Sequence, residues 1–84
     1  MIKIVILQRG WVFIGRLAKD GVECTLTDSF NIRRWGTSKG LGELAEVGPL
    51  SETQLDKVGT VTFHELTTVA TIDCNQSIWE NVLK

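Results

Sequence analysis

The residues best suited to binding a ligand lie together between positions 31 and 42. This segment reads NIRRWGTSKGLG and contains two adjacent arginines, a tryptophan, three glycines, two hydroxyl side chains and a lysine. Glycines let a ligand approach the backbone, and guanidinium groups donate forked hydrogen bonds to phosphate. An indole ring gives a base a flat surface on which to stack. We expect six residues to form an anion-binding site: Arg33, Arg34, Trp35, Thr37, Ser38 and Lys39.

In this expected site the arginines and Lys39 neutralise phosphate, Trp35 stacks on a ring, and the two hydroxyls donate hydrogen bonds. The ligand class that fits these groups is a small phosphorylated, nucleotide-derived molecule. The order of residues does not match the P-loop pattern G-x-x-x-x-G-K-[ST], so a nucleotide triphosphatase is not indicated. The alternative is a turn with solvated arginines and a tryptophan in the core.

No catalytic or metal-binding constellation accompanies this segment. His64 and Glu65 are adjacent, but no serine or cysteine nucleophile has a matching context, so a small hydrolase is only a third hypothesis. One histidine without a C-x-x-C pair, and carboxylates without a D-x-D pattern, indicate no metal and no cofactor. Cys24 and Cys74 occupy apolar positions of expected strands, which predicts two buried, reduced thiols rather than a disulfide. We therefore do not expect an enzyme.

Charge is distributed unevenly along the chain, although the net charge is only −1. Residues 1–40 contain seven Lys or Arg and three acidic residues, a balance of +4, and residues 41–84 contain two and seven, a balance of −5. This asymmetry is compatible with a basic face for an anionic ligand or with opposite patches that meet between subunits. A third possibility is that folding mixes the two halves, so that their charges balance locally. Nine Lys or Arg and a pI of about 5.7 argue against duplex nucleic acid as a partner.

The pattern of apolar residues predicts a small, mostly β domain of the α+β class. The β-branched run at 2–7, the segment 11–18 and the alternation at 22–27 predict three strands, and Asp20-Gly21 predicts a tight turn between the last two. They predict an antiparallel sheet or barrel-like meander with one or two short helices. After residue 27 the sequence is compatible either with continued alternation or with a bulge or turn at Asp28-Ser29.

The second half predicts short helices and two further strands. Ser38 is expected to cap a helix that buries Leu41, Leu44 and Ala45 and stops at Gly48-Pro49. Capping-box patterns at 51–54 and 77–80 predict two helical turns. Strands are expected at 58–63 and 66–74, with Ala70, Ile72 and Cys74 facing inward. Trp11 and Trp79 are expected to pack in the core, and the next alternative for either is a place in an oligomer interface.

Eighty-four residues allow a single domain, 1–84, with a core that gains stability from oligomerisation. The apolar opening is too short to span a membrane, which predicts a soluble protein with no membrane partner, and the cysteine content favours a cytoplasmic one. Opposed charges and three tryptophans in a small chain predict a homo-oligomer.

Three runs carry a resemblance to a known family: TLTD at 25–28, IRRW at 32–35 and GLGELA at 40–45, followed by Gly48. Together with HELT at 64–67 and the closing IDC at 72–74, they resemble a family of short, uncharacterised tailed-bacteriophage proteins. The family pattern has two tryptophans after the double arginine, whereas this chain has one. The resemblance implies an accessory protein in the bacterial cytoplasm and supplies no activity.

By analogy with small phage proteins that sequester immune signals, the leading hypothesis is a non-catalytic, anti-defence sponge for a nucleotide-derived ligand. The alternative is a protein-interaction module that inhibits a host enzyme or takes part in phage assembly, with the same residues forming the interface.

Overall fold

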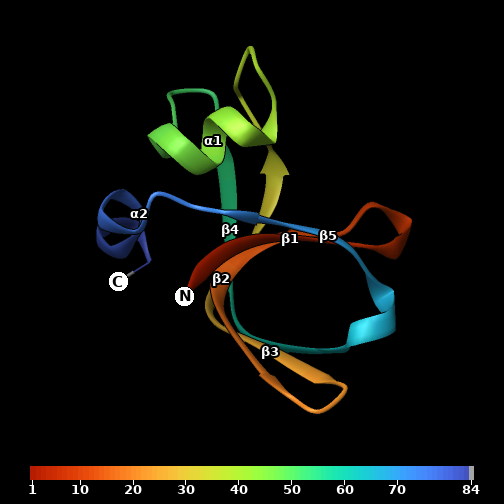
Figure 1. Cartoon of the computed structure of the whole chain (residues 1–84). Helices are drawn as coiled ribbons and strands as arrows, with labels where there is room; N and C mark the ends of the chain where they lie inside the picture. The colour runs from red at the N-terminus through yellow and green to blue at the C-terminus, as the bar shows by residue number, and fades with distance from the viewer. Residues whose placement is uncertain (84) are drawn as a thin grey trace.

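Five antiparallel strands form one sheet in the order β4-β3-β2-β1-β5, and two short helices accompany it (Figure 1). This computed structural model describes residues 1–83 and confirms the expected mostly β, α+β class. The strands are β1 (Ile2–Leu7), β2 (Val12–Asp20), β3 (Glu23–Arg34), β4 (Gln54–His64) and β5 (Thr68–Asp73). The helices are α1 (Leu41–Val47) and α2 (Gln76–Val82), with short 3-10 turns η1 (Gln8–Gly10) and η2 (Glu65–Thr67).

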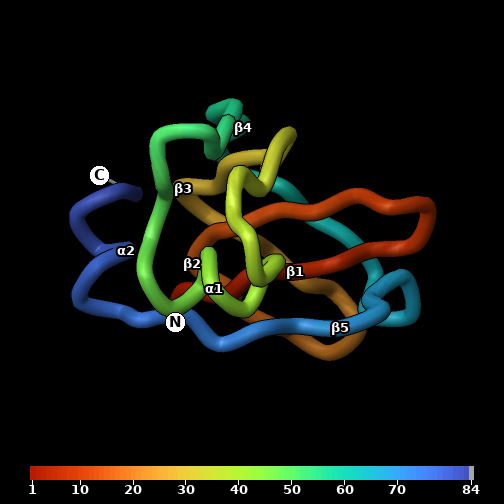
Figure 2. Tube along the Cα trace, turned by 90° about the horizontal axis from the view of Figure 1, so that it is seen from above, coloured from red at the N-terminus to blue at the C-terminus, as the bar shows by residue number. Residues whose placement is uncertain are grey.

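The sheet curls so that its two edge strands are joined by η2, while both helices lie outside the curl (Figure 1). Seen from above, α2 lies at one end beside the N-terminus, and the β1–β2 turn lies at the other (Figure 2). We call the side of the sheet that packs on the helices the helix face and the opposite side the inner face. Each face buries its own group of apolar side chains.

A bulge in β3 allows this one strand to supply both faces. Asp28 has a φ of 52°, and the pairing between β2 and β3 shifts at this point. Before the bulge Leu26 lies opposite Leu17 on the inner face, and after it Phe30 lies opposite Ile14 on the helix face. Of the two alternatives left open by the sequence, the strand therefore continues, and it does so through a bulge.

Gly15 lies beside the bulge, and the close approach of β3 requires a glycine there. A Cβ atom at this position would lie 3.0 Å from the Cβ of Ser29 and 3.1 Å from the carbonyl oxygen of Thr27. Ser29 is itself fully buried, and its hydroxyl donates a 2.6 Å hydrogen bond to the carbonyl of Gly59 in β4. The buried hydroxyl thereby has a hydrogen-bond partner where the ladder between β3 and β4 is irregular.

The two buried groups differ in size. The helix face carries the larger one, which includes Ile2, Ile4, Ile14, Ile32, Leu41, Leu44, Ala45, Cys74, Trp79 and Leu83. The inner face carries Val5, Leu7, Phe13 and Leu26, with Leu17, Val61 and Phe63 packed against them and partly exposed. The burial of Leu41, Leu44 and Ala45 confirms the expected inner side of the first helix. Trp79 is fully buried as expected, whereas Trp11 is 56% exposed and stacks on Phe13.

Several expected boundaries are wrong. Ser38 does not cap α1, because Gly40 precedes the helix with a φ of 83° and the Glu43 carboxylate accepts the Lys39 amide instead. Residues 51–54 form no helical turn, since Thr53 donates to the carbonyl of Trp35 and β4 starts at Gln54 rather than Val58.

The C-terminal expectations also need correction. Residues 66 and 67 belong to η2 rather than to the strand expected at 66–74, and Ala70 is exposed although Ile72 and Cys74 face the core. The second helix begins at Gln76, so Ser77 lies inside it and Glu80 points to Arg16 instead of closing a capping box.

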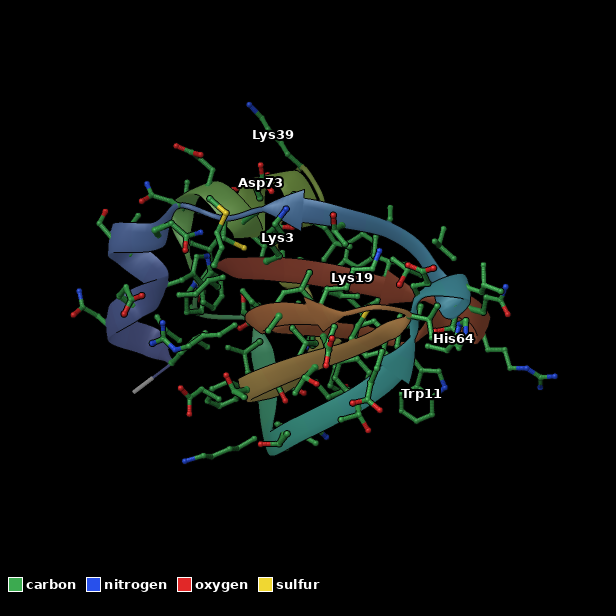
Figure 3. All side chains as sticks on the ribbon, turned by 60° about the horizontal axis from the view of Figure 1, so that its bottom comes forward. Lys3, Trp11, Lys19, Lys39, His64 and Asp73 are labelled. Carbon is green, nitrogen blue, oxygen red and sulfur yellow. The ribbon has the colours of Figure 1, made fainter. Side chains whose placement is uncertain are left out.

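Ion pairs connect the basic and acidic halves of the sequence. Lys3 and Asp73 lie together on neighbouring strands with their charged atoms 3.0 Å apart (Figure 3). Among residues 1–83, five such pairs join the halves: Lys3–Asp73, Arg16–Glu80, Lys19–Glu65, Arg33–Asp56 and Arg34–Glu52. The fold thus places most basic side chains of the first half next to acidic side chains of the second half. This is the third of the alternatives given above for the uneven charge.

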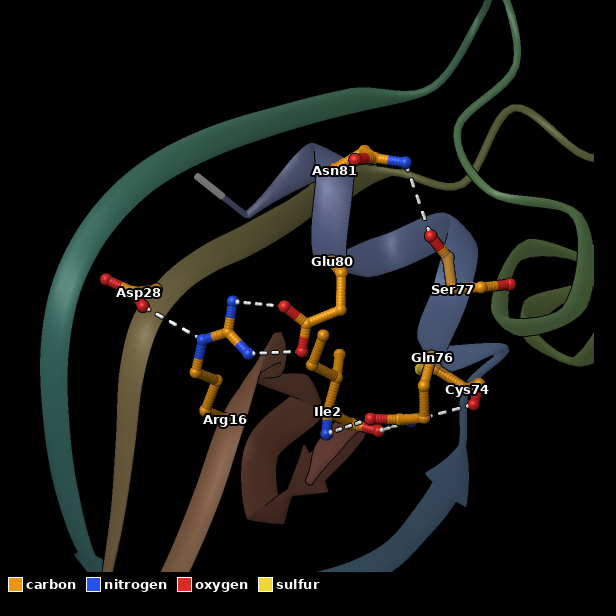
Figure 4. Close-up of polar contacts among 8 residues, drawn as sticks. All are labelled: Ile2, Arg16, Asp28, Cys74, Gln76, Ser77, Glu80 and Asn81. Atoms are coloured by element: carbon orange, nitrogen blue, oxygen red, sulfur yellow. Dashed lines mark hydrogen bonds and ion pairs between the residues drawn. The ribbon is translucent and has the colours of Figure 1, made fainter.

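Helix α2 is held by polar contacts on two sides (Figure 4). The side-chain amide of Gln76 accepts from the backbone amide of Ile2 and donates to the carbonyls of Ile2 and Cys74, each at 2.8 Å. Arg16 donates to both carboxylate oxygens of Glu80 at 2.7 and 3.1 Å and to Asp28 at 3.0 Å. These hydrogen bonds raise the pKa of Arg16 above its usual value.

Trp79 fastens α2 to α1 and should contribute strongly to stability. Its ring is fully buried, and its Nε1 donates a 3.1 Å hydrogen bond to the carbonyl of Ala45. We expect Trp79→Phe to lower the free energy of unfolding by about 1–3 kcal/mol, because it removes buried ring area and one hydrogen bond. Urea unfolding measures this, with Trp11→Phe as the matched control at an exposed position. Equal losses in the two variants would contradict the assignment.

Candidate functional site

The six residues predicted to bind an anion occupy the end of β3 and the loop that leads to α1. Arg33 and Arg34 are adjacent at the end of β3, where the pairing with β4 shifts between Ile32 and Arg34. Nε of Arg33 lies 3.0 Å from a carboxylate oxygen of Asp56, and Nη2 of Arg34 lies 3.4 Å from one of Glu52. Each arginine thus already has an acidic partner of its own.

The loop after Trp35 is fixed by close backbone packing. Gly36 has a φ of 68°, and a Cβ atom there would lie 2.3 Å from the backbone of Glu52 and Thr53. The hydroxyl of Thr53 accepts from the Leu50 amide at 2.9 Å and donates to the carbonyl of Trp35 at 2.7 Å. The segment 50–53 therefore holds the Trp35–Gly36 backbone in place.

The remaining predicted residues do not form a phosphate cradle. The hydroxyl of Thr37 donates to the carbonyl of Gly40 at 2.7 Å, and Ser38 is exposed. The Lys39 amide donates to the Glu43 carboxylate at 2.8 Å, so an acidic side chain already lies where an anion would be placed. The Lys39 side chain points away from the body of the protein (Figure 3).

Together these residues form an exposed surface, which we call the Arg-Trp surface: Arg33, Arg34, Trp35, Thr37, Ser38 and Lys39. Trp35 is 44% exposed, and the side chains of both arginines are more than half exposed. The alternative, in which this tryptophan lies in the core, is therefore not observed. A surface of this kind, with guanidinium groups around a partly buried indole, has the composition of a protein interface.

A cavity of about 290 Å³ lies on the inner face, and sequence reasoning did not find it. Its wall comes from β1, β2, β3, β4, η2 and β5, on the concave side of the curled sheet. Apolar side chains of the inner-face core form part of the wall, and Lys19 and Glu65 add one charge of each sign. We call this space the inner cavity. It is lined by Val5, Leu17, Lys19, Cys24, Phe63, Glu65, Leu66, Thr68 and Thr71.

Lys19 and Glu65 form an ion pair beside this cavity. The hydrogen bond to Glu65 raises the pKa of Lys19, and the hydrogen bond from Lys19 lowers the pKa of Glu65. Both groups consequently keep their charges at neutral pH. The two residues are 46 positions apart in the sequence, so no local sequence motif predicts the pair.

His64 has a structural role at the start of η2. Its Nδ1 accepts a 3.0 Å hydrogen bond from the Leu66 amide, and its carbonyl accepts from the Thr67 hydroxyl at 2.7 Å. The neighbouring Glu65 carboxylate pairs with Lys19. This arrangement does not place a base next to a nucleophile.

The two cysteines are buried free thiols, as predicted. Burial raises the pKa of the Cys74 thiol to about 11, which keeps it protonated and unreactive at neutral pH. Cys24 lines the inner cavity, whereas Cys74 belongs to the helix-face core. Within residues 1–83, no group of three or more His, Cys, Asp or Glu side chains is placed to hold a metal ion.

No protein-family model matches the chain, and a comparison with curated proteins gives no match. In the part of the chain that the structure describes, neither helix has the length and apolar character needed to cross a membrane.

The Lys19–Glu65 pair predicts a shifted titration of one carboxyl group. We expect the pKa of Glu65 to lie below its usual value and to rise in Lys19→Met, because the substitution removes the hydrogen bond and the positive charge. Since the pKa of the folded state is the lower one, stability from this pair is present above the unfolded pKa and is lost as pH falls through the folded pKa. Carbon-detected NMR of the carboxyl group measures it, with Lys3→Met as control. An unchanged Glu65 pKa in Lys19→Met would refute the coupling.

Proposed function

We propose that this protein acts without turnover, by binding another protein through the Arg-Trp surface. Exposed Trp35, with Arg33 and Arg34 beside it on the chain, is the observation that carries the proposal. Tryptophan and arginine are the residue types that most often dominate the affinity of protein interfaces. The setting we propose, a phage accessory protein in the bacterial cytoplasm, rests on the resemblance of the runs at 32–35 and 40–45.

The shape of the Arg-Trp surface favours a protein over a small molecule as the partner. Small ligands usually bind in concave sites that cover most of their surface. The side chains of Arg33, Arg34 and Trp35 are all exposed, so one small ligand on a single chain would stay largely uncovered. A protein surface can contact both arginines and the indole at once. Inhibition of a host enzyme and participation in phage assembly are both compatible with such a surface, and so is contact with a second copy.

Photo-crosslinking at position 35 tests this proposal in bacterial cells. A photoreactive residue in place of Trp35 should give a crosslinked product of defined mass with one protein, which can be a second copy. The matched control is position 22, because Val22 is 51% exposed and lies near the opposite end of β3. Alanine at both Arg33 and Arg34 should weaken the contact by about 2 kcal/mol or more, roughly thirtyfold in affinity. Equal products from positions 35 and 22, or none from either, would refute the proposal.

A second candidate is sequestration of a small phosphorylated, nucleotide-derived ligand by a homo-oligomer. One observation favours it: the acidic partners of Arg33 and Arg34 are themselves largely exposed, so a phosphate can displace them at little cost. Two copies of the Arg-Trp surface facing each other would supply the enclosure that one copy lacks. Trp35 then provides the stacking surface.

Calorimetric titration distinguishes this candidate from the first. Cyclic dinucleotides, cyclic ADP-ribose isomers and mononucleotides form the panel, and sedimentation velocity reports the oligomer. If one of them binds, Arg34→Ala should lower the affinity by about 1.5–3 kcal/mol, or ten- to a hundredfold, and Arg34→Lys should not restore it fully. Lys57→Ala, another cation near this end of β4, is the control. Absence of binding across the panel, or a double Arg33/Arg34 alanine variant that binds like the parent, rules this candidate out.

A further inference from the structure

The inner cavity is independent of the Arg-Trp surface. Cys24, which lines the cavity, and Arg34 lie ten residues apart near the two ends of β3, a separation of roughly 30 Å along an extended strand. The cavity volume of about 290 Å³ is close to the lower end of the range seen for small-molecule sites. A ligand there would therefore be small, and it would leave the Arg-Trp surface free.

The walls of the inner cavity suit an apolar group. Val5 is fully buried, and Leu17 and Phe63 are packed against the inner-face core while still bordering the cavity. A branched aliphatic or aromatic side chain placed against them would lose its contact with water at little cost in polar desolvation. Thr68 and Thr71 add hydroxyl groups to the β5 side of the wall.

The Lys19–Glu65 pair decides which polar group such a ligand should carry. The two side chains are 56% and 34% exposed, so they lie where the cavity meets solvent. A ligand with a single charge would pair with one of them and leave the other without its partner. A ligand with an ammonium and a carboxylate on the same carbon atom can pair with Glu65 through the ammonium and with Lys19 through the carboxylate. Both charges then remain compensated when the direct ion pair opens.

We propose that the inner cavity binds a free α-amino acid with an apolar side chain. The side chain lies against Val5, Leu17 and Phe63, the ammonium contacts the Glu65 carboxylate, and the carboxylate contacts the Lys19 ammonium. The site thus recognises two features of the ligand, an apolar side chain and a zwitterionic head group. Neither the Arg-Trp surface nor a partner protein is needed for this binding.

NMR titration with L-leucine and L-phenylalanine tests the proposal on the intact protein. We expect saturable shifts of the Cys24, Leu66 and Thr71 amides with at least one of the two. Phenethylamine and 3-phenylpropionate, which each keep one charge, should bind at least tenfold more weakly than L-phenylalanine. Toluene tests the apolar body alone and should also be at least tenfold weaker. Lack of saturable shifts with both amino acids, or equal binding of toluene and L-phenylalanine, overturns the proposal.

Substitutions of the ion pair provide the second arm. Lys19→Met and Glu65→Gln should each lower amino-acid affinity about tenfold, whereas Lys19→Arg should keep most of it. Lys3→Met is the matched control, because Lys3 forms a similar pair with Asp73 but does not line the cavity. Circular dichroism checks that each variant is folded. Because the substituted side chains are partly exposed, we expect the fold to be retained. Parent-like affinity in both Lys19→Met and Glu65→Gln would also overturn the assignment.

Discussion

The left-handed backbone of Asp28 shifts the alternation of β3 by one residue, and both buried cores depend on this shift. Without it, Leu26 and Phe30 would face the same side of the sheet, and one face would lose an apolar contributor. The shift needs space, which Gly15 gives by lacking a side chain, and it needs a satisfied polar group, which Ser29 gives by its hydrogen bond to Gly59. A small chain thereby builds a helix face and an inner face from a single sheet.

The curl of the same sheet creates the inner cavity. Both helices pack on the helix face, whereas the inner face lies within the curl of its own strands, next to η2. Its core has few fully buried side chains, and β4 and β5 are the two edges of the sheet and are not paired with each other. The Arg-Trp surface arises differently, because it sits where β3 leaves the sheet and where the loop 35–40 is fastened by Thr53.

Local patterns predicted most of the fold. The β-branched run of β1, the Asp20-Gly21 turn and the buried side of α1 follow from period and turn chemistry that a few neighbouring residues determine. The predicted helix caps were wrong, because Glu43 and Thr53 form hydrogen bonds that depend on tertiary packing rather than on the nearest capping motif. The six residues of the Arg-Trp surface lie within one short segment of the sequence, whereas the acidic partners of Arg33 and Arg34 come from another part of the chain. For the same reason the inner cavity, whose residues come from six elements, could not be predicted from the sequence.

The ion pairs between the two halves have an evolutionary consequence. Positions 3 and 73, or 19 and 65, are far apart in sequence, yet each pair carries opposite charges in contact. A charge reversal at one member of a pair leaves two like charges together, and a second reversal at the other member restores the attraction. In related chains the signs at these positions should therefore change in concert. Such correlated changes would reveal distant kinship through this fold even where little direct sequence identity survives.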